Sequence, residues 1–177
     1  MHKKGFRVLD IAVIGIMTAI LIAAKTALDF LPNIELVSFL IILYAVTFGW
    51  RVLCVVPIFV LVQLVLYPFG DWLIMYLYIW WIPAVFGMLM RRFDNAWFWS
   101  IFSGIYGLMF GALCSVTYFA LGALEGGFSY GMTAAFAKWI SGIPFDLTHC
   151  AGNFAIMLIL YIPVKKAFTA IKKGLSL

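Results

Sequence analysis

Residues 8–28 read VLDIAVIGIMTAILIAAKTAL, an apolar run whose charged residues are Asp10 and Lys25. A transmembrane helix needs about 20 consecutive, mainly apolar residues, so this stretch has the length and composition of a membrane span. Basic residues precede it, as in a secretory signal peptide, but it is too long for a signal sequence and further apolar runs follow it. We therefore expect it to be retained as a first transmembrane helix.

The rest of the chain has the same character. Of its 177 residues, 66% are hydrophobic and 11% are charged, and the mean hydropathy is +1.12. These values lie outside the range of soluble globular domains. At roughly 20 residues a span there is room for about six spans and for no soluble domain. We predict an all-α, polytopic membrane protein: a single domain, residues 1–177, with six transmembrane helices.

Short polar or helix-breaking segments separate the apolar runs. After residues 8–28, we expect spans at about 35–48, 52–67, 72–90, 96–121 and 138–164. Pro57 is expected to kink the third span. The longest interruption, residues 122–137, contains Glu125 and several glycines, and we expect it to be a loop.

The charge pattern predicts the orientation in the membrane. An even number of spans places both termini on one side, and every basic residue except Lys25 and Lys138 then falls on that side. The positive-inside rule predicts that both termini are cytoplasmic. This distribution accounts for the net charge of +5 without a nucleic-acid partner. The three cysteines are odd in number and lie in apolar stretches, so no disulfide framework is expected.

Residues 139–153, WISGIPFDLTHCAGN, interrupt this apolar pattern. On a helix, offsets of three, four and seven residues place Asp146, His149 and Asn153 on one face. Pro144 is expected to break the helix, so that the residues before it hang over that face. An ionisable group facing hydrocarbon costs about 2.5–3.5 kcal/mol on insertion scales, so we expect the polar face to line a watery cavity.

Polar and aromatic residues of other spans are expected at a similar depth, near the outer surface of the membrane. Aromatic faces can stack on a planar ring, while charged and amide groups orient it by hydrogen bonds, which suits a small polar solute that contains a ring. The predicted substrate-binding residues are Lys25, Asp29, Asn33, Glu35, Gln63, Asp71, Tyr76, Trp80, Lys138, Trp139, Asp146, His149 and Asn153, with Tyr78 and Trp81 as further aromatic candidates.

Each of these residues also has a purely structural interpretation. Lys25 can pair with Asp29 four residues later on the same helix face. His149 can be a packing residue that is hydrogen-bonded to Asp146, and Asn153 can be an interhelical hydrogen-bonding group. The aromatic residues can form an interfacial belt, and the acids can cap helices.

Small residues recur along the first span at intervals of four. Such a stripe lets another helix approach closely, either within the chain or in a partner. The stripe consists of Gly15, Ala19, Ala23 and Ala27.

The chain resembles the substrate-binding S components of energy-coupling factor (ECF) vitamin transporters over essentially its whole length. The stretches that carry the resemblance are LDFLPNIELVSFLIILYAVTFG (28–49), YLYIWWIP (76–83) and KWISGIPFDLTHCAGNF (138–154). The resemblance implies a multi-pass protein of the bacterial plasma membrane that binds one micronutrient from outside. It also implies docking on a scaffold membrane protein with two ATPases, with Gly15, Ala19 and Ala23 facing the scaffold.

Further expectations follow from this resemblance. The chain has no G-x-x-x-x-G-K-[ST] loop, so another chain would supply the energy of ATP. The turn at residues 31–33 and the segment 122–131 would act as lids. The aromatic density favours a planar heteroaromatic vitamin of the pyridoxine, thiamin or riboflavin type, or a corrinoid in a wide cavity. No cofactor is expected.

Two other classes of function remain open. In a membrane enzyme, Asp146 and His149 would act as a base and its orienting partner, or as zinc ligands. A zinc site needs at least three protein ligands, and we expect no metal. In a self-sufficient proton- or ion-coupled carrier, Asp146, His149 and Lys25 would form a relay, although no inverted repeat is evident.

Overall fold

The computed structural model describes residues 7–177, and within that range it is helical with no strand. The prediction of an all-α fold is confirmed. The N-terminal Lys3 and Lys4, which contributed to the predicted orientation, lie outside the described residues. The elements are α1 (Val8–Leu28), α2 (Val37–Phe48), the 3₁₀ turn η1 (Gly49–Arg51), α3 (Val52–Leu66), α4 (Trp72–Ile79), α5 (Trp81–Leu89), α6 (Ala96–Leu108) and α7 (Phe110–Gly174).

Four helical stretches are long and apolar enough to cross a membrane when adjoining helices are counted together. They are Val8–Leu28, Val37–Leu66, Trp72–Leu89 and Ala96–Gly174 in the described part of the chain. These stretches are compatible with insertion into a lipid bilayer.

The first three helices alternate in direction. Arg51 at the start of α3 pairs with Asp10 at the start of α1, and Tyr67 at the end of α3 contacts Asp29 at the end of α1. α3 is therefore parallel to α1 and packs directly against it, and α2, which connects them in the sequence, runs in the opposite direction. The reversal between α2 and α3 occurs at Gly49, whose φ of +64° favours a residue without a Cβ.

The core is centred on α2. Nearly every residue of this helix is buried, and it contacts α1, α3, α5 and α7. α1 buries only one face, with Val13, Ile14, Met17 and Leu21 toward the other helices. In a membrane such contacts stabilise the bundle through close van der Waals packing.

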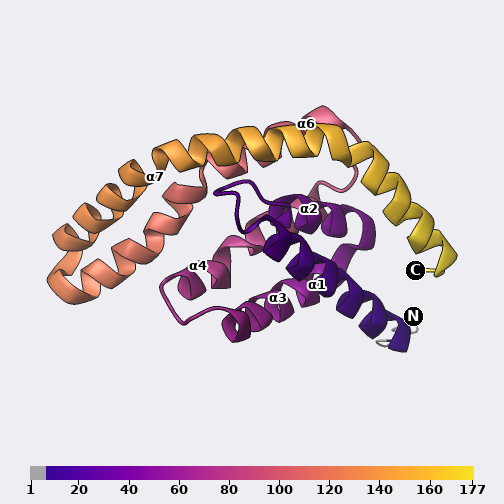
Figure 1. Ribbon diagram of the computed structural model, residues 1–177, viewed down its shortest axis with the longest axis horizontal. Helices are drawn as coiled ribbons and strands as arrows, with labels where there is room; N and C mark the ends of the chain where they lie inside the picture. Colours follow the sequence, from indigo (N-terminus) through magenta and orange to yellow (C-terminus); the bar gives the residue numbers. More distant parts are fainter. Residues whose placement is uncertain (1–6) are drawn as a thin grey trace.

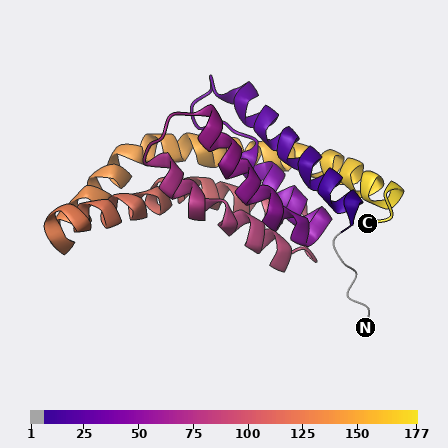
Figure 2. The ribbon, with the colours of Figure 1, turned by 90° about the horizontal axis from the view of Figure 1, so that it is seen from below.

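α7 runs outward to a tip, reverses there at Gly126–Gly127 and arches back over the helices α1 to α5 (Figure 1). The tip lies far from both chain ends. The start of α1 and the end of α7 lie at the same end of the molecule in both views (Figures 1 and 2). α6 packs along the second part of α7. At Gly107 a Cβ would lie 2.8 Å from the carbonyl carbon of His149, so this close approach requires glycine.

The segment 122–137 is not a loop, and this prediction is wrong. Only Gly126 and Gly127 depart from helical backbone angles, and Gly127 has φ +81°. The two arms of the resulting helical hairpin touch where a Cβ on Gly131 would lie 2.6 Å from the carbonyl oxygen of Phe119. The glycines therefore serve a tight reversal and close helix packing, and they do not form a mobile connection.

Three expected helix boundaries also differ. The predicted span 72–90 divides at Trp80 into α4 and α5, and the predicted span 96–121 is interrupted at Met109. α7 continues through Pro144 and ends at Gly174, ten residues beyond the expected end at 164. Proline is tolerated inside membrane helices when neighbouring groups satisfy the freed backbone atoms. Pro57 likewise lies inside α3.

Candidate functional site

A cavity of about 230 Å³ lies at the end of the bundle where α1 ends and α2 begins. α1, the α1–α2 connection, α4 and α7 all contribute to its wall. The lining residues are Lys25, Leu28, Asp29, Leu31, Pro32, Asn33, Ile34, Glu35, Val37, Tyr76, Trp80, Phe110 and His149. The structure thus brings together Lys25, Asp29, Asn33, Glu35, Tyr76, Trp80 and His149 of the predicted substrate-binding residues.

The α1–α2 connection forms one wall of this cavity. A turn closes with a 2.9 Å hydrogen bond from the Leu31 amide to the Leu28 carbonyl, and Asn33 follows with φ +59°. Asparagine adopts this left-handed conformation more readily than most residues. Glu35 then accepts a 2.9 Å hydrogen bond from the Ser38 amide in the first turn of α2, and a second from the Ser38 hydroxyl. The Glu35 carboxylate is therefore held in place by the helix it precedes.

A hydrogen bond joins His149 of α7 to Glu35, with 3.1 Å between Nε2 and Oε1. His149 is buried, and its ring packs edge-on to Phe110 with 4.7 Å between centroids. The predicted alternative, a hydrogen bond between His149 and Asp146, is not found. Asp146 instead accepts a 2.8 Å hydrogen bond from the Gly111 amide, because Gly111 has no side chain and lets the two arms of α7 approach closely.

The rim of the cavity carries a second polar group of residues. Lys25 donates to Asp29 over 2.8 Å, Tyr67 donates to the other oxygen of Asp29, and the Lys25 ammonium lies 4.5 Å from the centre of the Tyr67 ring. Partial burial raises the pKa of Asp29, but the hydrogen bonds from Lys25 and Tyr67 outweigh it and leave the pKa below its usual value. The predicted Lys25–Asp29 pair is confirmed.

Aromatic rings form another part of the cavity wall. Trp72 and Tyr76, Tyr76 and Trp80, and Trp80 and Phe110 are successive neighbours, with centroid distances of 5.3, 5.2 and 5.9 Å. The spacing of four residues on α4 places the first three rings in one row. The indole nitrogen of Trp80 is buried and has no hydrogen-bond partner in the described chain.

Gln63 lies in a smaller, adjoining cavity of about 100 Å³, which it lines with Lys25, Tyr67, Trp72 and Tyr76. Lys25 and Tyr76 also line the larger cavity, so the two spaces are neighbours. Gln63 is fully buried, and neither atom of its amide is hydrogen-bonded to residues 7–177. This orientable amide is therefore available at the edge of the site.

Asp146 and Asn153 lie beyond the cavity, and Asp146 is buried between the two arms of α7 through its hydrogen bond to Gly111. Both are at most 5% exposed, and neither lines the larger cavity. Both amide atoms of Asn153 and one oxygen of Asp146 lack a hydrogen-bond partner among the described residues. They extend the polar face of α7 by about one turn on either side of His149, as their helical spacing predicts.

Three predicted residues lie away from the cavity. Asp71 is hydrogen-bonded to Tyr118, and the Lys138 ammonium lies 4.6 Å from the centre of the same Tyr118 ring. Trp139 packs against Phe136 with 5.8 Å between centroids. Because α7 is not broken at Pro144, Lys138 and Trp139 stay on the helical hairpin and do not hang over His149.

Two further aromatic candidates are structural. The Tyr78 hydroxyl donates a 2.7 Å hydrogen bond to the Leu113 carbonyl, and Trp81 packs against the core. Two residues that the sequence reasoning missed contribute to the site: Tyr67 at the rim and Phe110 beside His149. Phe110 had no local signal, since it lies in an apolar run. The glycine spacing at 104, 107 and 111 could have indicated that this part of the chain packs closely against the segment that carries His149.

The stripe of Gly15, Ala19 and Ala23 is exposed on α1. The buried face of α1 lies on the other side of the helix, so the stripe is not used for packing within the described chain.

Residues 7–177 contain no group of three or more His, Cys, Asp or Glu side chains that could hold a metal ion. Comparisons with protein-family models, with curated proteins and with solved structures found no match to this chain.

Proposed function

We propose that this chain is the substrate-binding S component of an ECF-type importer and takes up a small, water-soluble vitamin. The observation that supports this most is the cavity of about 230 Å³, which is lined by both aromatic rings and polar groups. Concave sites with a few convergent polar groups are typical of small-molecule binding. The polar groups here are an ammonium, two carboxylates, an amide and an imidazole.

The size of the cavity limits the range of substrates that could bind in it. Ligand pockets for drug-sized molecules hold about 300–1,000 Å³, and this cavity is smaller. We infer a compound with one heteroaromatic ring and polar substituents, such as a pyridoxine-like molecule, and we disfavour a corrinoid. Tyr76 and Trp80 would contact the ring, while Glu35, His149 and Asn33 would bind its substituents.

The proposed membrane arrangement has about six spans with cytoplasmic termini, in a bacterial plasma membrane. It is supported by the alternating direction of α1, α2 and α3 and by the position of the basic residues. Arg51 lies beside the start of α1, whereas the cavity lies at its end, about 30 Å away for a helix of 21 residues. The positive-inside rule then places the cavity at the outer surface.

The proposed energy source is a separate module of a scaffold membrane protein and two ATPases. The exposed stripe on α1 supports this, since Gly15, Ala19 and Ala23 offer a flat surface to a partner helix. Within the chain, the turn at 31–33 is the remaining candidate lid, because it lines the cavity.

The test is purification from the native cell membrane, followed by mass spectrometry of any small molecule that remains bound. We expect a single vitamin-like compound, and its absence from a Trp80→Ala variant that is folded. Vesicles that contain this chain alone should bind the compound without accumulating it. A native preparation that binds no vitamin in titrations with the candidate compounds would overturn the proposal.

A second candidate is a stand-alone proton-coupled carrier. The specific observation in its favour is the partly buried Glu35–His149 pair, which has the chemistry of a proton relay. The same vesicles separate the two functions. Accumulation of the solute by the chain alone under an imposed proton gradient would favour the carrier, whereas binding without accumulation favours the S component.

A further inference from the structure

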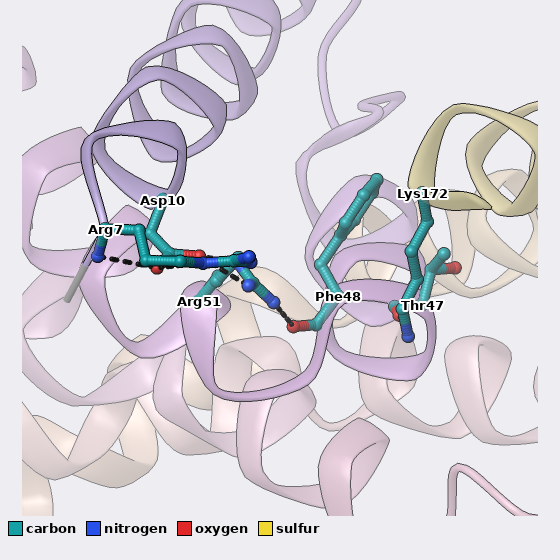
Figure 3. Close-up of polar contacts among 6 residues, drawn as sticks. All are labelled: Arg7, Asp10, Thr47, Phe48, Arg51 and Lys172. Carbon is teal, nitrogen blue, oxygen red and sulfur yellow. Dashed lines mark hydrogen bonds and ion pairs between the residues drawn. The ribbon is translucent and has the colours of Figure 1, made fainter. Parts of the chain in front are cut away.

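Another cavity, of about 540 Å³, lies at the opposite end of the bundle from the candidate substrate site. It is formed by the α2–α3 turn, the residues after α5 and the end of α7; Figure 3 shows Thr47, Phe48, Arg51 and Lys172 from its lining. Its lining residues are Val46, Thr47, Phe48, Gly49, Trp50, Arg51, Arg91, Arg92, Lys172 and Leu177. We call this space the basic cavity, because four of these side chains are cationic and none is acidic.

One of the four cations is already neutralised. Arg51 donates to Asp10 with 2.9 Å between Nε and Oδ1, and its Nη1 donates to the Phe48 carbonyl over 3.2 Å. Figure 3 shows the Arg51 guanidinium lying between these two partners. Arg51 therefore shapes the cavity, and its charge is balanced within the fold.

The other three cations have no anionic partner among residues 7–177. Lys172 donates a 2.7 Å hydrogen bond to the Thr47 carbonyl, which carries no net charge (Figure 3). Arg91 and Arg92 are exposed and form no ion pair within residues 7–177. A carboxylate at Leu177 would still leave the set positive. The basic cavity thus concentrates uncompensated positive charge from segments that are distant in sequence.

The neutral hydroxyl of Thr47 and the N-terminus of α3 add to the positive potential of the basic cavity. Thr47 is only 6% exposed, and its hydroxyl has no hydrogen-bond partner in the described part of the chain. The 15-residue helix α3 begins directly after the turn at Gly49, and a helix N-terminus carries partial positive charge. Guanidinium groups bind phosphate oxygens in a bidentate manner. This combination suits a phosphate group.

The surroundings are apolar, as expected for a lipid and not for a free phosphate. Trp50 beside the cavity is 41% exposed, and Leu89 and Phe93, on either side of the arginines in sequence, are 69% and 51% exposed. Tryptophan is enriched at membrane–water interfaces. The basic cavity also lies at the end of the apolar helices, which is the depth of the headgroups when such helices cross a bilayer.

We propose that the basic cavity binds the phosphate of an anionic phospholipid headgroup, with Arg91, Arg92, Lys172 and the Thr47 hydroxyl as its ligands. The acyl chains would lie along the exposed apolar residues next to the cavity. A bound headgroup would connect the α2–α3 turn with the end of α7. This role is independent of the substrate that the other cavity takes.

The test is titration of the purified protein in detergent with phosphatidylglycerol and with phosphatidylcholine, monitored by native mass spectrometry. We expect the wild type to prefer phosphatidylglycerol. The Arg91→Gln/Arg92→Gln variant should lose at least about tenfold in affinity for it, since each basic residue near an anionic lipid contributes roughly fivefold. Thr47→Val should lose less, and the double arginine variant should lose less affinity for phosphatidylcholine than for phosphatidylglycerol, because the choline ammonium offsets the phosphate charge.

The matched control is Lys166→Gln/Lys173→Gln, which removes the same charge from exposed positions of α7 outside the basic cavity. It should lose clearly less affinity for phosphatidylglycerol. Equal losses in the two double variants would overturn the proposal, because net charge alone would then explain binding. Inorganic phosphate that displaces the lipid at equal phosphate concentration would also overturn it, in favour of a free-phosphate site. The proposal would also be overturned if the protein showed no preference for phosphatidylglycerol and Arg91 and Arg92 were instead needed to bind a partner protein.

Discussion

Glu35 and His149 are 114 residues apart in the sequence, yet Oε1 of the one lies 3.1 Å from Nε2 of the other in the wall of the candidate substrate cavity. The same carboxylate accepts hydrogen bonds from Ser38 in the first turn of α2. One side chain therefore fixes the start of α2 and connects it to α7. Any ligand that contacts this pair contacts both helices at once.

His149→Leu should weaken ligand binding about 10- to 100-fold, because a hydrogen bond to a charged group contributes roughly 1.5–3 kcal/mol. Isothermal titration with the co-purified compound measures the change. Thr148→Val is the matched control, since Thr148 is the exposed neighbour and bonds only to the Pro144 carbonyl of its own helix. Wild-type affinity in the His149 variant would show that the imidazole does not touch the ligand.

Asp29→Asn should lower thermal stability at neutral pH, because it removes the charge that Lys25 and Tyr67 bind. The pKa of Asp29 is lower in the folded protein, so its contribution is present above the unfolded pKa and is lost as the pH falls through the folded pKa. The melting temperatures of wild type and variant should differ by a constant amount from pH 8 to about 5 and converge below about pH 4. A difference that grows on acidification would contradict this assignment.

Asp10→Asn should destabilise the protein, because it leaves the buried guanidinium of Arg51 without its anionic partner. Thermal unfolding in detergent, followed by intrinsic fluorescence, measures the effect. Asp94→Asn serves for comparison: Asp94 pairs with Lys165, but its side chain is 72% exposed, so its loss should change stability by less than about 1 kcal/mol. Equal melting temperatures for the two variants would argue against a structural role of the Asp10–Arg51 pair.

Gly107→Ala should cost about 1–3 kcal/mol, because the added Cβ would lie 2.8 Å from the backbone of His149 and force the helices apart. Gly15→Ala should be neutral or stabilise the protein by up to about 1 kcal/mol, since no atom lies within 4 Å of its Cβ position and alanine favours helix. The free energy of unfolding of both variants provides the measurement. A stable Gly107 variant would mean that α6 and α7 are less closely packed than described.

Ala19→Leu tests the exposed stripe on α1. The isolated protein should keep its melting temperature, because Ala19 is exposed and contributes nothing to the core. Co-purification with an ECF scaffold subunit should fall several-fold, because the larger side chain would prevent close approach of a partner helix. Ile20→Leu, an exposed position beside the stripe, should leave co-purification unchanged.

Hydropathy predicted the helices well where an apolar run ended in a true turn, as at Leu28 and Leu66. It could not predict the reversal at Gly126–Gly127, because glycine marks both loops and close helix packing. Lys25, Glu35 and His149 could be expected to face one another, since charged groups avoid lipid. The hydrogen-bond partner of each residue could not be predicted from the sequence. Glu35 reaches His149 only because of how α2 and α7 are placed, and Asp146 accepts its hydrogen bond from the backbone amide of Gly111.

The continuity of α7 makes it a mechanical lever. His149 beside the substrate cavity and Lys172 beside the basic cavity belong to one helix, and at 1.5 Å per residue they are about 35 Å apart along its axis. A tilt of about 5° with its pivot at His149 therefore displaces Lys172 by about 3 Å, enough to break its hydrogen bond to Thr47. A small adjustment around a solute at the candidate site would in this way become a larger displacement at the opposite end of the molecule.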